Sequence, residues 1–207
     1  SEVLTVSVGV SASGGLSLNF TVAALLSENF VSGTTRAAIS DSDVDAVGNL
    51  TLTALTQLDI DTTGAAVAVS IAASTGVAVG VGAAAAVATN SGTATTEAMI
   101  DAGADVAAAN IALDAQNLAT LDAVTTAVAA GVAVSGTGAA SITIAAAVAA
   151  NTLGGATRAA IDDAKVVATG ALTLDALSDA TITADAIGVS ASLAADYYVL
   201  RDPMPEP

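Results

Sequence analysis

Val67-Ala68-Val69-Ser70-Ile71 is the stretch that decides the fold, because branched and small residues alternate in it with a period of two. Such alternation indicates a β-strand. At a constant 61-residue step the pattern recurs before this stretch, in Val6-Ser7-Val8-Gly9-Val10, and after it, in Val128-Ala129-Ala130-Gly131-Val132. A fixed period of this length is typical of a solenoid or another repeat array. The chain is therefore predicted to be a stack of similar β units.

Three copies of the 61-residue pattern follow one another without a gap, over residues 2–62, 63–123 and 124–184, and a partial fourth begins at 185. We expect residues 1–195 to form an all-β solenoid, with a parallel β-helix as the favoured form. A stack of antiparallel hairpins, each closed by a Ser/Gly turn, is the alternative. Residues 196–207 depart from the pattern at Asp196-Tyr197-Tyr198 and are predicted to be a cap or a linker. Because the chain begins at Ser1 within the pattern, we expect it to be a segment of a longer protein.

Within one repeat, two strands are predicted at residues 4–12 and 16–26, followed by a polar loop at 28–34. A short strand at 36–39, an acidic turn at 40–43, a brief segment at 44–46 and a Gly-Asn turn at 48–49 lead to a last strand at 50–60. The even positions of that last strand are apolar and should face the core, while most odd positions face water. The first two strands have no polar face, and their second face is made of small residues such as Ala66, Ala68, Ser70 and Ala72. This small-residue face is expected to be buried between layers or between chains.

The charge of the chain excludes several classes of partner. Its formal net charge is −16, and its basic side chains are Arg36, Arg158, Lys165 and Arg201. Such a chain offers no basic surface for nucleic acid. Two stretches without charge, residues 62–96 and 123–157, are long enough for membrane-spanning helices, but their period of two and their Ser, Thr and Gly content indicate strands. We therefore expect neither nucleic-acid binding nor membrane insertion.

Two sets of polar residues recur at the 61-residue step. Asn29, Asn90 and Asn151 form the first set, and Arg36, Glu97 and Arg158 form the second. If one repeat makes one coil, the asparagines stack about 4.8 Å apart as an amide ladder, and the charges alternate in sign along one edge. If each repeat makes two or three rungs, the same groups lie roughly 10–14 Å apart and neither ladder forms. The alternative role of the asparagines is that of simple turn formers.

Asp41, Asp43 and Asp45 resemble the opening of a calcium loop. An EF-hand would place Gly and then a bidentate Glu where Ala46 and Leu52 stand, so calcium is only a weak candidate against a solvated turn. The chain has no Cys and no His, which removes disulfides, zinc sites and imidazole catalysis. No other cofactor is expected.

Catalysis is not expected either, because the repeat leaves no place for a single specialised cluster. Cleavage of a glycan would need an acid, a nucleophile and groups that stack on sugar rings at one non-repeating site. No polar or aromatic insertion breaks the pattern. A carbohydrate-binding or carbohydrate-cleaving β-helix and a membrane-inserted assembly remain as alternative functions.

The segments 79–90, 95–101 and 109–115, together with their counterparts 145–151, 156–162 and 170–176, resemble the repeats of very large bacterial β-strand-repeat surface proteins. That group includes leukotoxin-A-like filamentous adhesins and haemagglutinin-type exoproteins. The resemblance implies an extracellular or cell-surface location and a role as fibre, adhesin stalk or filament. It implies self-association into a filament or lateral assembly, or passive spacing of other domains, and it does not identify a receptor.

Overall fold

The computed structural model describes residues 1–197, and residues 198–207, with most of the predicted cap or linker, lie outside the described part. The described chain is all β, without a helix, and consequently without any helical segment that could cross a bilayer. Its strands are β1 (Glu2–Ser13), β2 (Leu16–Ser40), β3 (Asp43–Asp45), β4 (Leu50–Ser74), β5 (Val77–Asp101), β6 (Asp105–Ala108), β7 (Ile111–Ser135), β8 (Gly138–Ile161), β9 (Lys165–Ala168) and β10 (Leu172–Asp196).

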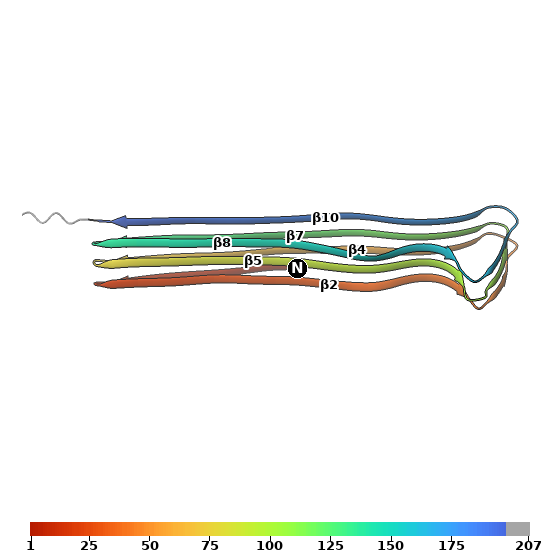
Figure 1. The fold of residues 1–207 in the computed structure, drawn as a ribbon, viewed down its shortest axis with the longest axis horizontal. Helices are drawn as coiled ribbons and strands as arrows, with labels where there is room; N and C mark the ends of the chain where they lie inside the picture. The colour runs from red at the N-terminus through yellow and green to blue at the C-terminus, as the bar shows by residue number, and fades with distance from the viewer. Residues whose placement is uncertain (198–207) are drawn as a thin grey trace, which may run out of the picture.

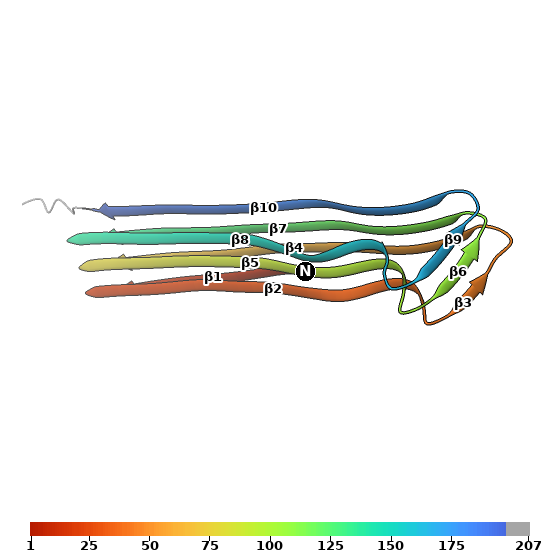
Figure 2. The same ribbon diagram turned by 45° about the vertical axis from the view of Figure 1, so that its right-hand side comes forward.

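The strands form three parallel sheets that run along a solenoid (Figures 1 and 2). Sheet A has the order β1-β4-β7-β10, sheet B the order β2-β5-β8, and sheet C the order β3-β6-β9. Residues 61 apart are paired throughout sheets A and B, as in Val6 with Val67 and Phe20 with Val81. Each repeat is therefore one coil. The parallel β-helix is confirmed, and the alternative of antiparallel hairpins is wrong, because every strand pairs with its counterpart in the next coil.

The coil is long and flat. Six of the strands in sheets A and B contain 24 or 25 residues, which corresponds to roughly 80 Å at about 3.3 Å per residue. A narrow turn joins the two sheets at one end, and the short strands of sheet C join them at the other (Figure 2). We call these the narrow end and the broad end. The molecule is a plate whose two walls are sheets A and B.

Two predicted boundaries are wrong, since neither the polar loop at 28–34 nor the break after residue 60 exists. Residues 28–34 continue β2, and the predicted last strand of one repeat runs directly into the first strand of the next as β4. Asn and Gly ordinarily favour turns. Here each residue at these positions is in register with the same position of the neighbouring coil, as in Asn29 with Asn90 and Gly33 with Ala94, so the stack overrides the local preference.

The narrow turn depends on serine and glycine. Ser13 Oγ accepts a hydrogen bond from Gly15 N at 3.1 Å and donates one to Leu16 O at 2.8 Å. Ser74 repeats the first contact, accepting from Gly76 N at 3.0 Å. A Cβ on Gly76 would lie 2.3 Å from Gly15 O in the coil beneath. Glycine at position 76 therefore lets this turn stack on the one beneath it at the spacing of the strands.

Sheet C departs from the gapless 61-residue step. Asp43 pairs with Asp105, and Asp105 pairs with Lys165, so the first step is one residue longer than the repeat and the second is one residue shorter. The second coil has one residue more before its short strand and one residue fewer after it. The shift places Val44, Val106 and Val166 together on the inner side. A strict step of 61 would align Val44 with Asp105 and turn a carboxylate into the core.

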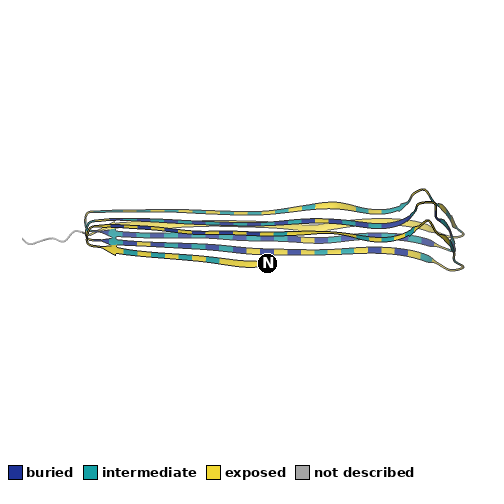
Figure 3. Cartoon of the chain, turned by 90° about the horizontal axis from the view of Figure 1, so that it is seen from below, coloured by how far each residue is buried: buried dark blue, intermediate teal, exposed yellow. Residues whose placement is uncertain are grey.

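The inner faces of sheets A and B change character along the plate. Toward the narrow end they carry small residues, and Ala66, Ala68 and Ala86 are completely buried there. The opposing backbone is so close that a Cβ on Gly82 would lie 3.3 Å from Ala130 O. The small-residue face is thus buried between the two sheets of one chain, and Figure 3 shows the alternation of buried residues with intermediate ones along the inner strands, β5 and β7.

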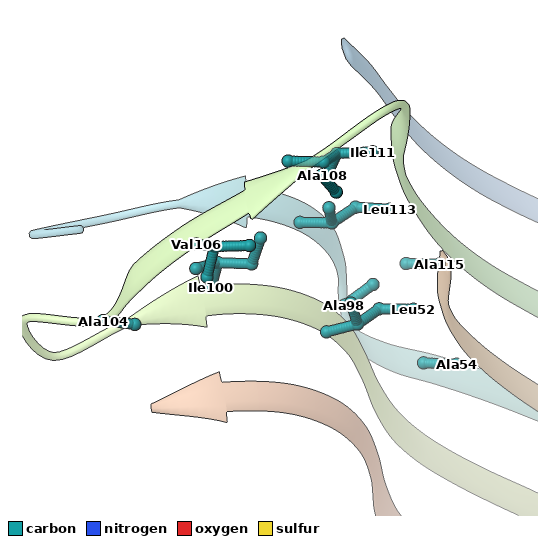
Figure 4. Close-up of a cluster of buried hydrophobic side chains, with 10 residues drawn as sticks. All are labelled: Leu52, Ala54, Ala98, Ile100, Ala104, Val106, Ala108, Ile111, Leu113 and Ala115. Atoms are coloured by element: carbon teal, nitrogen blue, oxygen red, sulfur yellow. The ribbon is translucent and has the colours of Figure 1, made fainter. Parts of the chain in front are cut away.

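Toward the broad end the plate widens and its core contains large side chains. Ile100, Val106, Ile111 and Leu113 point toward one another from sheets A, B and C (Figure 4). All four are at most 1% exposed. The third sheet supplies the space that these side chains need, so the fold has a tight alanine-rich half and a wider aliphatic half.

Candidate functional site

The structure brings the three recurring asparagines together inside the plate. Asn29 Nδ2 donates to Asn90 Oδ1 at 3.1 Å, and Asn90 Nδ2 donates to Asn151 Oδ1 at 3.0 Å. Asn90 Nδ2 also donates to Asp122 O at 2.7 Å, and Asn90 Oδ1 accepts from Thr62 Oγ1. The ladder therefore connects neighbouring coils and also fastens sheet B to sheet A. These asparagines are not turn formers.

The recurring charges are only partly paired. Arg36 Nε lies 3.6 Å from Glu97 Oε2, and the same guanidinium contacts Asp101. Glu97 and Arg158 are register neighbours, but within residues 1–197 Arg158 makes its ion pair with Asp162, at 3.5 Å. Both arginine side chains are 43–50% exposed. Exposed ion pairs of this kind contribute little to stability. This row of charges therefore favours the in-register alignment of the coils more than it stabilises them.

The weak calcium candidates do not converge on a common point. Asp41 lies in the turn before sheet C with φ of 46°, and Asp43 and Asp45 stand two residues apart in β3. In the part of the chain that the structure describes, no three acidic side chains are grouped so that they could hold a metal ion. Asp43 instead belongs to a vertical row with Asp105 and Lys165.

An ion pair that the sequence did not reveal lies in that row. Lys165 Nζ donates to Asp105 Oδ2 at 2.7 Å. The hydrogen bond and the charge of Asp105 raise the pKa of the Lys165 ammonium above 10.5. A step of 61 aligns Lys165 with Ala104. The sequence indicates the pair of Lys165 with Asp105 only if the strands are aligned so that Val44, Val106 and Val166 all face the core.

A hollow of about 620 Å³ lies beside Ser1 and is lined by Glu28 to Val31 and by Asp59 to Asp61. Glu28 and Phe30 are exposed side chains of the outer face of β2, and Asp59 and Asp61 are exposed side chains of the outer face of β4. The carboxylates therefore flank the hollow from the two opposite walls. This arrangement does not place a general acid and a general base beside the same substrate bond.

The outer faces of the walls are the most distinctive surfaces. Toward the narrow end they carry large apolar side chains, including Val8, Val10, Leu18 and Phe20, which are 63–74% exposed. From the middle of the plate toward the broad end the outer face of sheet A is acidic. Its carboxylates are Glu2, Asp59, Asp61, Asp114, Asp122, Asp175, Asp179 and Asp185. Each wall is therefore divided across its length into an apolar half and a polar half.

The uncharged stretches of the sequence include the narrow half of the plate and extend beyond it in sheet B. Residues 62–96 run through the second half of β4, pass the narrow turn and return along most of β5. Their branched side chains point outward and their small side chains point inward. Comparisons with models of protein families, with curated proteins and with solved structures find no match for this chain.

Proposed function

We propose that the chain is a structural repeat module of an extracellular bacterial fibre, adhesin stalk or cell-surface filament, and that it acts by self-association. The observation that carries the proposal is that one 61-residue repeat makes one coil, with its strands in parallel register with those of the next. Each added repeat extends all three sheets and the amide ladder without new kinds of contact. Stability then rises with copy number, as in other linear repeat proteins.

The dimensions of the coil favour self-association over passive spacing. One coil adds about 4.8 Å along the solenoid axis, whereas an α-helix made from one such repeat would add about 90 Å at about 1.5 Å per residue. A chain selected only to separate two domains would gain little length from so many residues. The residues of one coil instead form two broad sheet surfaces.

The extracellular bacterial setting rests on the resemblance to β-strand-repeat surface proteins. The absence of Cys agrees with export in an unfolded state but does not require it. Mechanical strength would come from the continuous backbone ladders, because breaking one coil from the next requires the loss of many parallel hydrogen bonds at once.

Cryo-electron microscopy of the purified chain at micromolar concentration, without detergent, tests the proposal. We expect ordered filaments or layers of plates, with an axial repeat of about 4.8 Å. Single plates that remain monodisperse as the concentration is raised would overturn self-association and assign the repeats to spacing. The same sample in fibre diffraction should show the strand spacing along the assembly axis if coils stack end to end.

A further inference from the structure

We propose that a second copy of this chain packs on the apolar half of the outer face of sheet A. This inference rests on the proposed function and specifies its lateral interface. We call this surface the sheet A patch. It consists of the outward side chains within residues 4–12, 65–73, 126–134 and 187–195.

The sheet A patch is flat, regular and without charge. Its rows are the same position in successive coils, as in Val6, Val67, Val128 and Val189, and Thr126 is its one hydroxyl residue. Val6, Val8 and Val10 are 57–69% exposed. Ladders of identical branched side chains on a flat sheet interdigitate well with a second such sheet. The chemistry of the surface therefore matches itself.

The size of the patch agrees with a weak dimer interface. It extends about 30 Å along the strands and about 19 Å across four coils, or roughly 570 Å². A patch of this size is at the upper end for a monomer surface, where patches are often functional. A pair of patches would bury roughly 1,100 Å², close to the lower limit for a specific interface. The outer face of sheet B also has an apolar half, on β2, β5 and β8.

The acidic half of the same wall fixes how the two copies overlap. In a complete overlap with strands parallel, the carboxylates of one copy would face those of the other, with no Lys or Arg on this face of the described sheet to neutralise them. Like charges brought together at an interface oppose association. A two-fold axis that lies in the interface, perpendicular to the strands and through the centre of the patch, avoids this, because the strands then run antiparallel and the acidic halves project in opposite directions.

A lipid surface fits this face less well than a second copy does. The net charge of −16 repels anionic headgroups, and none of the basic residues within the described part of the chain lies on the outer face of sheet A. Interfacial Trp is absent from the chain. Binding to vesicles is therefore an outcome that would count against the inference.

The test compares three variants of the full chain by sedimentation equilibrium, after circular dichroism has established that each keeps its β spectrum. Val69→Glu puts a carboxylate at the centre of the sheet A patch, and Thr53→Glu puts one on the same face of the same strand, in the acidic half. Val81→Glu is the equivalent change on the outer face of sheet B. We expect Val69→Glu to raise the dimer dissociation constant at least a hundredfold, while the other two change it less than about threefold, because only the first buries a charge.

Each of the following results would contradict a different part of the proposal. No association of the unmodified chain at any concentration would refute the proposed function itself. Association that survives Val69→Glu but is lost with Val81→Glu would assign the interface to sheet B and overturn this inference alone. Flotation of the unmodified chain with phosphatidylcholine vesicles, while it remains monomeric in solution, would assign the patch to lipid.

Discussion

Replacement of Asn90 by alanine should destabilise the plate far more than a change of one residue on its surface. Asn90 is 2% exposed. Its side chain makes four hydrogen bonds, with Asn29, Asn151, Asp122 O and Thr62. At about 1 kcal/mol for each bond lost, with its buried partners left unpaired, the free energy of unfolding should fall by about 3–5 kcal/mol.

The matched control is Asn110→Ala. Asn110 belongs to the same coil and also bridges coils through its amide, donating to Asn49 Oδ1 at 2.8 Å and accepting from Ala171 N at 2.7 Å. These bonds are exposed, so water replaces them when the side chain is removed. The expected loss is about 1 kcal/mol or less.

Equilibrium unfolding in urea, followed by circular dichroism, measures both changes. The dependence of the unfolding free energy on urea concentration should remain that of the unmodified chain. Asn90→Leu separates hydrogen bonding from volume, because leucine fills the site but cannot bond. We expect Asn90→Leu to lose at least about 2 kcal/mol. Equal losses at Asn90 and Asn110, or a leucine variant as stable as the unmodified chain, would refute the argument that burial makes the ladder important.

Three further changes follow from the same geometry. Gly82→Val should cost at least about 2 kcal/mol in urea unfolding, since its Cβ would already lie 3.3 Å from Ala130 O and larger branches force the sheets apart. Gly33→Val, where nothing lies within 4 Å of an added Cβ, should be nearly neutral in the same assay. Ala102→Gly should stabilise the chain by about 1 kcal/mol, because Ala102 has φ of 53° and the left-handed region disfavours a Cβ; an unchanged midpoint in urea would contradict this. Asp105→Asn should return the pKa of the Lys165 ammonium toward 10.5 in an NMR titration, since Asp105 raises it. Because the pKa of Lys165 is higher in the folded state than in the unfolded state, stabilisation by the pair of Lys165 with Asp105 should be complete below the unfolded-state pKa. It should be lost as the pH rises through the folded-state pKa. Lys165→Met should abolish that pH dependence.

The sequence predicted a β-solenoid with a 61-residue period but left open how many rungs one repeat makes. The structure shows one coil per repeat, because Val6, Val67 and Val128 lie side by side in parallel register. The inward face of residues 50–60 was also predictable, because there the large residues alternate with polar ones and Leu52, Ala54 and Ile60 are buried. Periodicity of two is a strong signal wherever the two faces differ in polarity.

Local preference misled the prediction where the stack supplies partners that one repeat lacks. Residues 28–34 are polar and rich in turn formers, yet they form part of β2, since the next coil satisfies their backbone. The pairing of Lys165 with Asp105 was missed for a related reason. A constant step of 61 cannot show that the second coil shifts by one residue to keep Val106 inside.

In the narrow half, size decides which face of each strand lies inside. Both faces are apolar there, so hydropathy favours neither orientation, and burying the larger side chains would gain more free energy per residue. The sheets nevertheless bury mainly Ala, Ser and Gly, because the two walls lie close together: a Cβ added to Gly82 would lie 3.3 Å from Ala130 O. The larger inner side chains of this half, Leu25 and Thr21, lie opposite Gly64 and Gly9. Most of the larger residues are left outside, where they add little to the stability of a single plate. Their regular placement on the outer walls is the reason for proposing that this surface contacts a second copy.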